Sequence, residues 1–235
     1  MSVGMASGVV GGVVGFGASI MLLPVIVWVF GPREAIPIMA IGALMANASR
    51  AAVWWREIDW KLNGVYCATA VPGAILGART LLSLDAGMIE ATLGAFLLAS
   101  IPARRWLIAR GFRMTLPGMA VVGGVIGCLT GLVASTGPLN TPFFLAYGLT
   151  KGAFIATEAV GSAAISLTKT LTFHTFGALT TATLARGLIV GSSLMVGSWI
   201  SKRILQSIDA HRFQYIIEIM MVAAGLSMLW AGLRG

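Results

Sequence analysis

Charged side chains are scarce in this chain. Lys, Arg, Asp and Glu together make up 10% of the 235 residues, whereas apolar types make up 57%. A water-soluble domain needs a larger polar share to cover its own surface. The composition therefore excludes an ordinary soluble protein and predicts an all-α integral membrane protein surrounded by lipid.

Cysteine and histidine are rarer still, with two residues of each type. Cys67 and Cys128 lie inside apolar stretches, and neither has a partner at the spacing of a metal site. We therefore expect no disulfide framework, no metal site and no cofactor. The N-terminus also lacks the basic segment that opens a cleavable signal peptide, so we expect none.

Acidic residues are outnumbered by basic ones, 8 against 16, which gives a net charge of +8. Nucleic-acid-binding proteins carry such an excess, but here the basic residues form short clusters between apolar stretches. One cluster comprises Arg104, Arg105, Arg110 and Arg113. Clusters of this kind are typical of the loops of multi-pass membrane proteins, so we expect no nucleic-acid partner.

Apolar stretches long enough to cross a bilayer recur along the chain, at roughly 3–30, 35–55, 62–82, 86–103, 116–148, 153–176, 183–201 and 213–233. Two of them, 3–30 and 116–148, stand out by their length. As an unbroken helix each would measure about 40 Å or more, against a hydrocarbon core of about 30 Å. Neither is therefore expected to cross the membrane as one straight helix.

Both long stretches carry helix-breaking residues near their middle. The first contains Gly15-Phe16-Gly17-Ala18-Ser19 followed by Pro24, and the second contains Ala134-Ser135-Thr136-Gly137-Pro138-Leu139-Asn140-Thr141-Pro142. Backbone inside a membrane can leave the helix only where protein or a watery cavity satisfies its polar groups. Two such breaks predict a central site.

A second repeated pattern accompanies the two breaks. The segment 79–86 and the segment 203–210 both read R-x-L-x-S-[L/I]-D-A. Ordinary loop residues and a helix cap could give this pattern by chance, but the same order of features in both halves favours a duplication. The sequence therefore predicts an N-terminal repeat, 1–113, and a C-terminal repeat, 114–235, each with one broken or re-entrant segment and three transmembrane helices.

The basic residues discriminate between two topologies. If all the stretches cross, the Lys and Arg residues outside the membrane, Lys169 set aside, divide 9 to 6 between the two sides, which is a weak bias. If 3–30 and 116–148 fold back as re-entrant hairpins, most of these residues collect on one side. The positive-inside rule therefore favours hairpins and a second repeat inverted relative to the first. Broken helices that still cross remain the alternative.

Three motifs in this order resemble those of a known family. Gly15-Phe16-Gly17-Ala18-Ser19 with Pro24 resembles the G-x-G-G-G-x-x-x-x-P signature of the sulfite exporter TauE/SafE family. Ser135-Thr136-Gly137-Pro138 with Pro142 is similar to its G-G-P-x-x-x-P element, and Pro72-Gly73 with Gly77-Ala78-Arg79 resembles its P-G-x-x-x-G-[A/S]-x span. Ala18-Ser19 and Ala134-Ser135-Thr136 depart from the family's glycines.

This resemblance implies a secondary transporter of the inner (plasma) membrane. The expected substrate is a small sulfur-containing or carboxylated anion, such as sulfite or an organosulfonate. Protons or another coupling ion would supply the driving force, and a homodimer is compatible with the resemblance. The glycine substitutions leave the particular substrate open.

The two breaks supply most of the candidate binding residues. Helix ends there would place free backbone N–H groups and positive dipole ends near the bilayer midplane, which suits an oxyanion that has lost its water. The same small residues could instead serve only close helix packing. The expected substrate-binding residues at the breaks are Gly17, Ala18, Ser19, Ser135, Thr136, Gly137, Asn140 and Thr141.

Lys169 lies in the middle of the stretch 153–176, where an unpaired ammonium would cost about 2.5–3.5 kcal/mol. We expect Lys169 to hold the anion, together with the neighbouring Thr168. Asn47 occupies the corresponding place in the first repeat and completes the expected site, whereas Arg50 is a weaker candidate because it could extend to the interface. The alternative is that Lys169 forms a structural ion pair.

Three further titratable residues, Glu158, His174 and Glu218, lie in apolar stretches. One of them could couple transport to protons, and Glu158 or Glu218 could be the counter-ion of Lys169.

Other functions were weighed against a transporter. A passive anion channel or the membrane subunit of a larger importer would have a similar series of apolar stretches. An intramembrane hydrolase that uses a serine with His174 fits less well, because no motif pairs the two residue types and one active site does not require two breaks.

Overall fold

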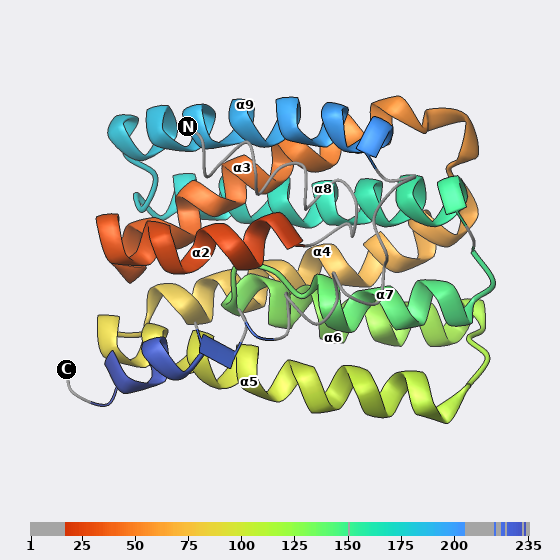
Figure 1. The fold of residues 1–235 in the computed structure, drawn as a ribbon, viewed down its shortest axis with the longest axis horizontal. Coiled ribbons are helices and arrows are strands. Elements are labelled where there is room, and N and C mark those ends of the chain that lie inside the picture. The colour runs from red at the N-terminus through yellow and green to blue at the C-terminus, as the bar shows by residue number, and fades with distance from the viewer. Residues whose placement is uncertain are drawn as a thin grey trace.

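The computed structural model describes residues 17–149 and 151–204, together with residues 219, 222, 223, 225–231 and 233. All regular structure in this part of the chain is helical (Figure 1). The elements are α2 (Gly17–Phe30), α3 (Pro32–Val53), the short 3₁₀ helix η1 (Trp55–Glu57), α4 (Trp60–Leu82), α5 (Ala86–Arg110), α6 (Leu116–Leu132), α7 (Gly137–Ala146), α8 (Lys151–Thr175) and α9 (Thr181–Ile204).

Side-chain caps fix where several helices begin. The carboxylate of Asp59 accepts a hydrogen bond from the backbone N–H of Leu62 at the start of α4, and Asp85 does the same for Met88 at the start of α5. Such caps satisfy backbone donors that have no partner within the helix. The Asp of the repeated R-x-L-x-S-L-D-A pattern is therefore a helix cap in its first copy.

The sequence-based end of α5 is wrong. We expected the stretch to end near residue 103, but the helix continues through Pro102 to Arg110 and ends where Gly111 adopts a left-handed conformation, with φ of 55°. Arg110 lies in its last turn. Cations favour the negative end of the helix dipole, so Arg104, Arg105 and Arg110 lie in the helix, and only Arg113 of the cluster lies in the connection that follows.

In the part of the chain that the structure describes, three helices are long and apolar enough to cross a membrane, Pro32–Val53, Trp60–Leu82 and Ala86–Arg110, while Leu116–Leu132 and Thr181–Val196 are apolar but shorter. α8 is 25 residues long and carries Glu158 and Lys169 within its apolar sequence. It packs against α3 and α4, so protein surrounds much of its polar surface. The all-helical expectation for a membrane protein is confirmed.

α4 and α6 pack with their backbones in contact. A Cβ atom placed on Gly127 of α6 would overlap the carbonyl oxygen of Ala70 in α4, and one on Gly77 would overlap that of Cys128. Small residues spaced four apart allow this approach between membrane helices. The Pro-Gly-x-x-x-Gly-Ala motif of α4 therefore has a packing role, which fixes the position of α6.

The stretch 116–148 folds back on itself. The N–H of Met114, before α6, donates a 3.0 Å hydrogen bond to the carbonyl of Ala146, the last residue of α7. The stretch thus starts and finishes at the same end of the bundle, with its break between Leu132 and Gly137. For the stretch 3–30, only the arm that follows the break is described, as α2.

Figure 1 shows α4 and α9 ending at opposite ends of the bundle. One end, where α3 finishes and α4 and α8 begin, carries the exposed Trp55 and Trp60, and Trp106 lies in the last turns of α5 at the same end. Exposed tryptophans favour the membrane interface. The inverted relation of the two repeats, and their boundary at residue 113, stay predictions.

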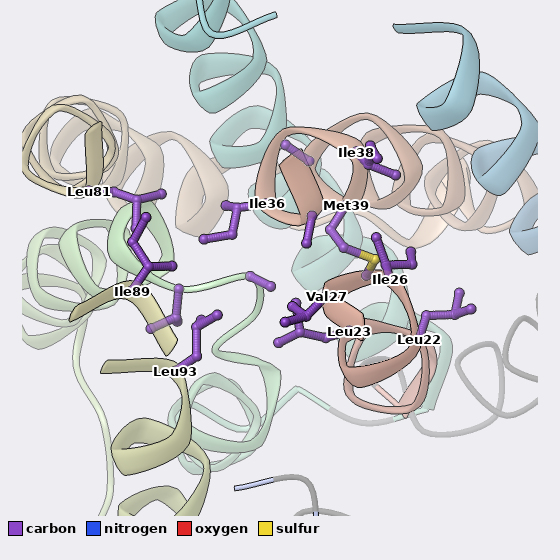
Figure 2. Packing of buried hydrophobic residues seen from close by; sticks show 14 of the residues in the cluster. Leu22, Leu23, Ile26, Val27, Ile36, Ile38, Met39, Leu81, Ile89 and Leu93 are labelled. Atoms are coloured by element: carbon purple, nitrogen blue, oxygen red, sulfur yellow. The ribbon is translucent and has the colours of Figure 1, made fainter. Parts of the chain in front are cut away.

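The main apolar cluster surrounds the break. Figure 2 shows Leu23 and Val27 of α2 on one side and Ile89 and Leu93 of α5 on the other. Val133 and Ala134 of the break belong to the same buried cluster, and so does Phe173 of α8. The non-helical backbone therefore lies inside protein, as a membrane protein requires.

Candidate functional site

Lys169 caps the C-terminal end of α6. Its Nζ atom donates hydrogen bonds of 2.6 Å to the carbonyl of Thr130 and of 2.7 Å to that of Val133. The last carbonyls of a helix have no partner within it, and they form the negative end of its dipole. Lys169 is 1% exposed, so these carbonyls replace the water that the ammonium has lost.

The partners of Lys169 differ from those that the sequence suggested. Glu158 pairs with Arg50 instead, and Glu218 lies outside the described residues. The ring of Phe173, one turn away, lies 6.0 Å from Nζ, within the range of a cation–π contact. An ammonium has three donors, and the two carbonyls engage two of them.

The N-terminal end of α7 faces the interior at the same break. Thr136 precedes the helix, is buried, and shares a hydrogen bond between its hydroxyl and that of Thr130. The N–H of Gly137 has a 3.4 Å contact with the Ser135 hydroxyl, whereas the N–H groups of Leu139 and Asn140 bond to the Thr136 carbonyl. The positive dipole end of α7 is thus buried next to small polar groups.

Asn140 is held from a neighbouring helix. Its Oδ1 atom accepts a 3.1 Å hydrogen bond from the hydroxyl of Tyr66 in α4, and the side chain is buried. This leaves its amide N–H₂ as a donor. Thr141 turns to its own helix and donates to the carbonyl of Gly137 at 2.9 Å. Tyr66 could not be predicted as part of the site, because a tyrosine in an apolar stretch is typical of a protein core.

α2 lies beside this break. Gly17, Ala18 and Ser19 form its first turn, and the structure describes only their backbone. Leu23, one turn further, lines a small crevice with Val133, Ala134 and Ser135, and α5 closes it with Leu93, Phe96 and Leu97. Ser135 is the polar residue in this lining.

Thr168, the other residue of α8 that we expected in the site, does not reach the break. The hydroxyl of Thr168 donates to the carbonyl of Ala164 at 2.8 Å, which is a bond within its own helix. Thr168 is half-buried. Of the two expected residues on α8, only Lys169 contacts the break.

Asn47 lies in a second polar cluster with Arg50, Glu158 and Ser162. Arg50 Nη2 is 3.2 Å from Glu158 Oε2 and also donates to Asn47 Oδ1, while the Ser162 hydroxyl donates to Glu158 Oε1 at 2.6 Å. Glu158 and Lys169 are about three helical turns apart on α8, or roughly 16 Å. The structure therefore does not bring Asn47 to Lys169.

Arg50 is only 7% exposed and stays inside the bundle, instead of extending to the interface. His174 is exposed, and no hydrogen bond among the described residues joins it to a serine. Within the same residues, no three His, Cys, Asp or Glu side chains gather closely enough to hold a metal ion.

The whole-chain comparison agrees with the motifs. The model of the sulfite exporter TauE/SafE family matches residues 1–228, which include both broken stretches. No curated protein and no solved structure matches the chain. The match extends over almost the entire sequence, and the chain therefore belongs to the sulfite exporter TauE/SafE family of membrane transporters.

Proposed function

We propose that this protein is a secondary transporter that moves small anions across the cytoplasmic membrane. Sulfite, organosulfonates and related sulfur-containing or carboxylated anions are the proposed substrates. Family membership supports the substrate class, and the folded-back break between α6 and α7 is the single structural observation that carries the proposal.

The proposed anion site lies at this break, between the start of α2 and the start of α7. The positive dipole end of α7 favours an anion that has shed water, and the N–H of Gly137, held only by a 3.4 Å contact with Ser135, would be its backbone donor there. The Ser135 hydroxyl and the Asn140 amide add side-chain donors around α7, whereas the Thr136 hydroxyl donates to Thr130, whose own hydrogen goes to the Ile126 carbonyl. On the α2 side, Gly17, Ala18 and Ser19 would contribute their backbone.

Lys169 has two proposed roles at this site. Its contacts with Thr130 and Val133 hold the end of α6 in place, and its charge makes the buried break electropositive. An anion there would be attracted by that charge without displacing both carbonyls, because one ammonium donor is not used by them. Lys169 would therefore shape the site and also attract the substrate.

Thermal stabilisation of the purified protein by a panel of anions tests the site. A ligand present at 100 times its Kd stabilises the folded state by about 2.7 kcal/mol. We expect sulfite and methanesulfonate to raise the melting temperature, and Asn140→Ala to weaken that rise more than the matched Thr168→Ala, whose hydroxyl bonds only to its own helix. Equal responses of the two variants would contradict the proposed location.

The rival functions predict other results. A membrane subunit of an importer would copurify with an ATPase, whereas a self-contained transporter works alone. A passive channel would conduct anions without any coupling ion. A hydrolase that uses a serine with His174 would lose its activity in His174→Ala, a variant that we expect to transport normally because His174 is exposed.

A further inference from the structure

We propose that Arg50 is a second anion subsite, separate from the break, and that Glu158 occupies it until its carboxyl group takes up a proton. This inference rests on the proposed anion transport and names protons as the coupling ion. The subsite would lie where α3 approaches its C-terminal end and packs against the first half of α8.

The Arg50–Glu158 pair is a costly feature for a membrane protein. Its side chains are 7% and 5% exposed, and the two residues are 108 positions apart in the sequence. Removing two charges from water can cost more than their attraction returns, and apolar residues of similar volume are often at least as stable. Charged residues inside a membrane bundle are typical of transport pathways. Stability alone therefore does not explain why the pair is present.

The Glu158 carboxylate resembles the proposed substrate in charge and shape. A guanidinium binds carboxylates and other planar or tetrahedral oxyanions through the same fork of N–H donors. In this structure a single guanidinium nitrogen, Arg50 Nη2, lies 3.2 Å from Glu158 Oε2, and Ser162 donates to the other carboxylate oxygen at 2.6 Å. A sulfonate in place of the carboxylate would find the same two donors.

The charges then require a proton. Arg50 and Glu158 together are neutral, so a bound monovalent anion would leave the buried cluster with one negative charge. If a proton from water binds to a carboxylate oxygen of Glu158, the cluster with the anion is neutral again and no other bond changes. One proton is therefore taken up for each monovalent anion that binds.

Few other groups could take that proton. The titratable side chains on the elements that pack against α8, besides Arg50, are Arg33, Glu34, Arg56, Glu57, Lys61, Tyr66, Cys67, Arg79 and Cys128, and Asp59 lies in the connection between η1 and α4. α7 has none. Glu34 lies at the far end of α3, and Glu57 packs against Gly152, about two turns before Glu158. The Asp59 carboxylate caps α4. Glu158 is therefore the carboxyl group that faces Arg50.

Isothermal titration of the purified wild-type protein with methanesulfonate tests this count of protons. A sulfonate stays a monovalent anion at neutral pH, so heats measured in buffers of different ionisation enthalpy report only protons taken up by the protein. We expect about one proton for each anion bound at the Arg50 subsite, and an affinity of that subsite that falls roughly tenfold for each pH unit once Glu158 is ionised.

Variants assign the proton to its residue. Glu158→Gln should bind the sulfonate without proton uptake and with an affinity that does not change with pH. Glu34→Gln is the matched control, because Glu34 pairs with the partly exposed Arg186 at the other end of α3. It should keep the wild-type proton count. Ser162→Ala removes a donor that the carboxylate and the bound sulfonate would share, so it should keep the wild-type proton count and weaken sulfonate binding.

The outcomes separate the two proposals. Binding by the wild type without proton uptake, or an unchanged pH dependence in Glu158→Gln, overturns the role of Glu158 and leaves anion transport standing. Failure of the wild type to bind any sulfonate, sulfite or carboxylate overturns the proposed function itself. If Glu158→Gln does not fold, the wild-type proton count and the affinity of Ser162→Ala still decide, and an unchanged sulfonate affinity in Ser162→Ala contradicts the inference.

Discussion

Two buried cations, Lys169 and Arg50, differ in what neutralises them. Lys169 contacts backbone carbonyls at the end of α6, whereas Arg50 contacts the carboxylate of Glu158. Carbonyl dipoles leave a net positive charge in place, while a carboxylate cancels it. This difference leads us to place the attractive charge at the break and the proton exchange at Arg50.

Lys169→Met should both destabilise the protein and weaken anion binding. The variant leaves the carbonyls of Thr130 and Val133 without their donor, and a buried group that loses its partner costs about 1–3 kcal/mol. Lys169→Arg keeps the charge and should retain part of both properties. Thermal unfolding with and without sulfite measures the two effects together. An unchanged melting temperature and an unchanged sulfite affinity in Lys169→Met would show that Lys169 neither stabilises the end of α6 nor attracts the anion.

The hydrogen bond between Tyr66 and Asn140 gives a second test at this scale. Tyr66→Phe removes the hydroxyl that holds the Asn140 side chain, and we expect a loss of about 1 kcal/mol in stability. A double-mutant cycle with Asn140→Ala should show coupling between the two changes. Additive losses would mean that the bond does not position the amide.

Individual residues show how much of the candidate site could be predicted from the sequence. A lysine in the middle of an apolar stretch was a clear signal for Lys169, because an unpaired charge there is costly. Its partners could not be predicted, because every residue has a backbone carbonyl. The carbonyls that bind Lys169 are available only because α6 ends there and leaves them without a partner in the helix. The pairing of Arg50 with Glu158 depends on how α3 packs against α8, and no local pattern encodes it.

At the scale of elements, the contact between α4 and α6 determines where the break lies. Gly127→Ala should push the two helices apart, because the new methyl group would overlap the carbonyl oxygen of Ala70. Overpacking of this kind costs about 1–3 kcal/mol. Gly64→Ala is the matched control, since that glycine lies in α4 with no atom near its missing Cβ. Thermal unfolding of the two variants should differ clearly, and similar values would contradict a tight α4–α6 interface.

The break of the stretch 116–148 was predictable because length and composition agreed. The stretch was too long for one crossing, and glycine and proline marked the point of interruption. The end of α5 was predicted wrongly because arginines after Pro102 looked like a loop. In the structure they extend the helix, and Gly111 ends it. Helix ends near a membrane interface depend on such caps more than on hydropathy.

For the whole molecule, the fold-back of 116–148 sets the directions of α8 and α9. α4 and α9 consequently end at opposite ends of the bundle (Figure 1). We expect cysteines in Thr80→Cys and Lys202→Cys, each made without Cys67 and Cys128, to react with an impermeant reagent from opposite sides of the membrane. Labelling of both from the same side of intact cells would rule out the inverted repeat.

Uptake by proteoliposomes tests the central claim, anion transport coupled to a proton gradient, most directly. Purified protein is reconstituted, and the internal concentration of labelled methanesulfonate is followed with and without an imposed proton gradient. We expect accumulation above the external concentration only when the gradient is present, and loss of that accumulation in Glu158→Gln but not in Glu34→Gln. Equilibration to the external concentration that ignores the gradient would identify a channel, and no uptake at all would contradict the account.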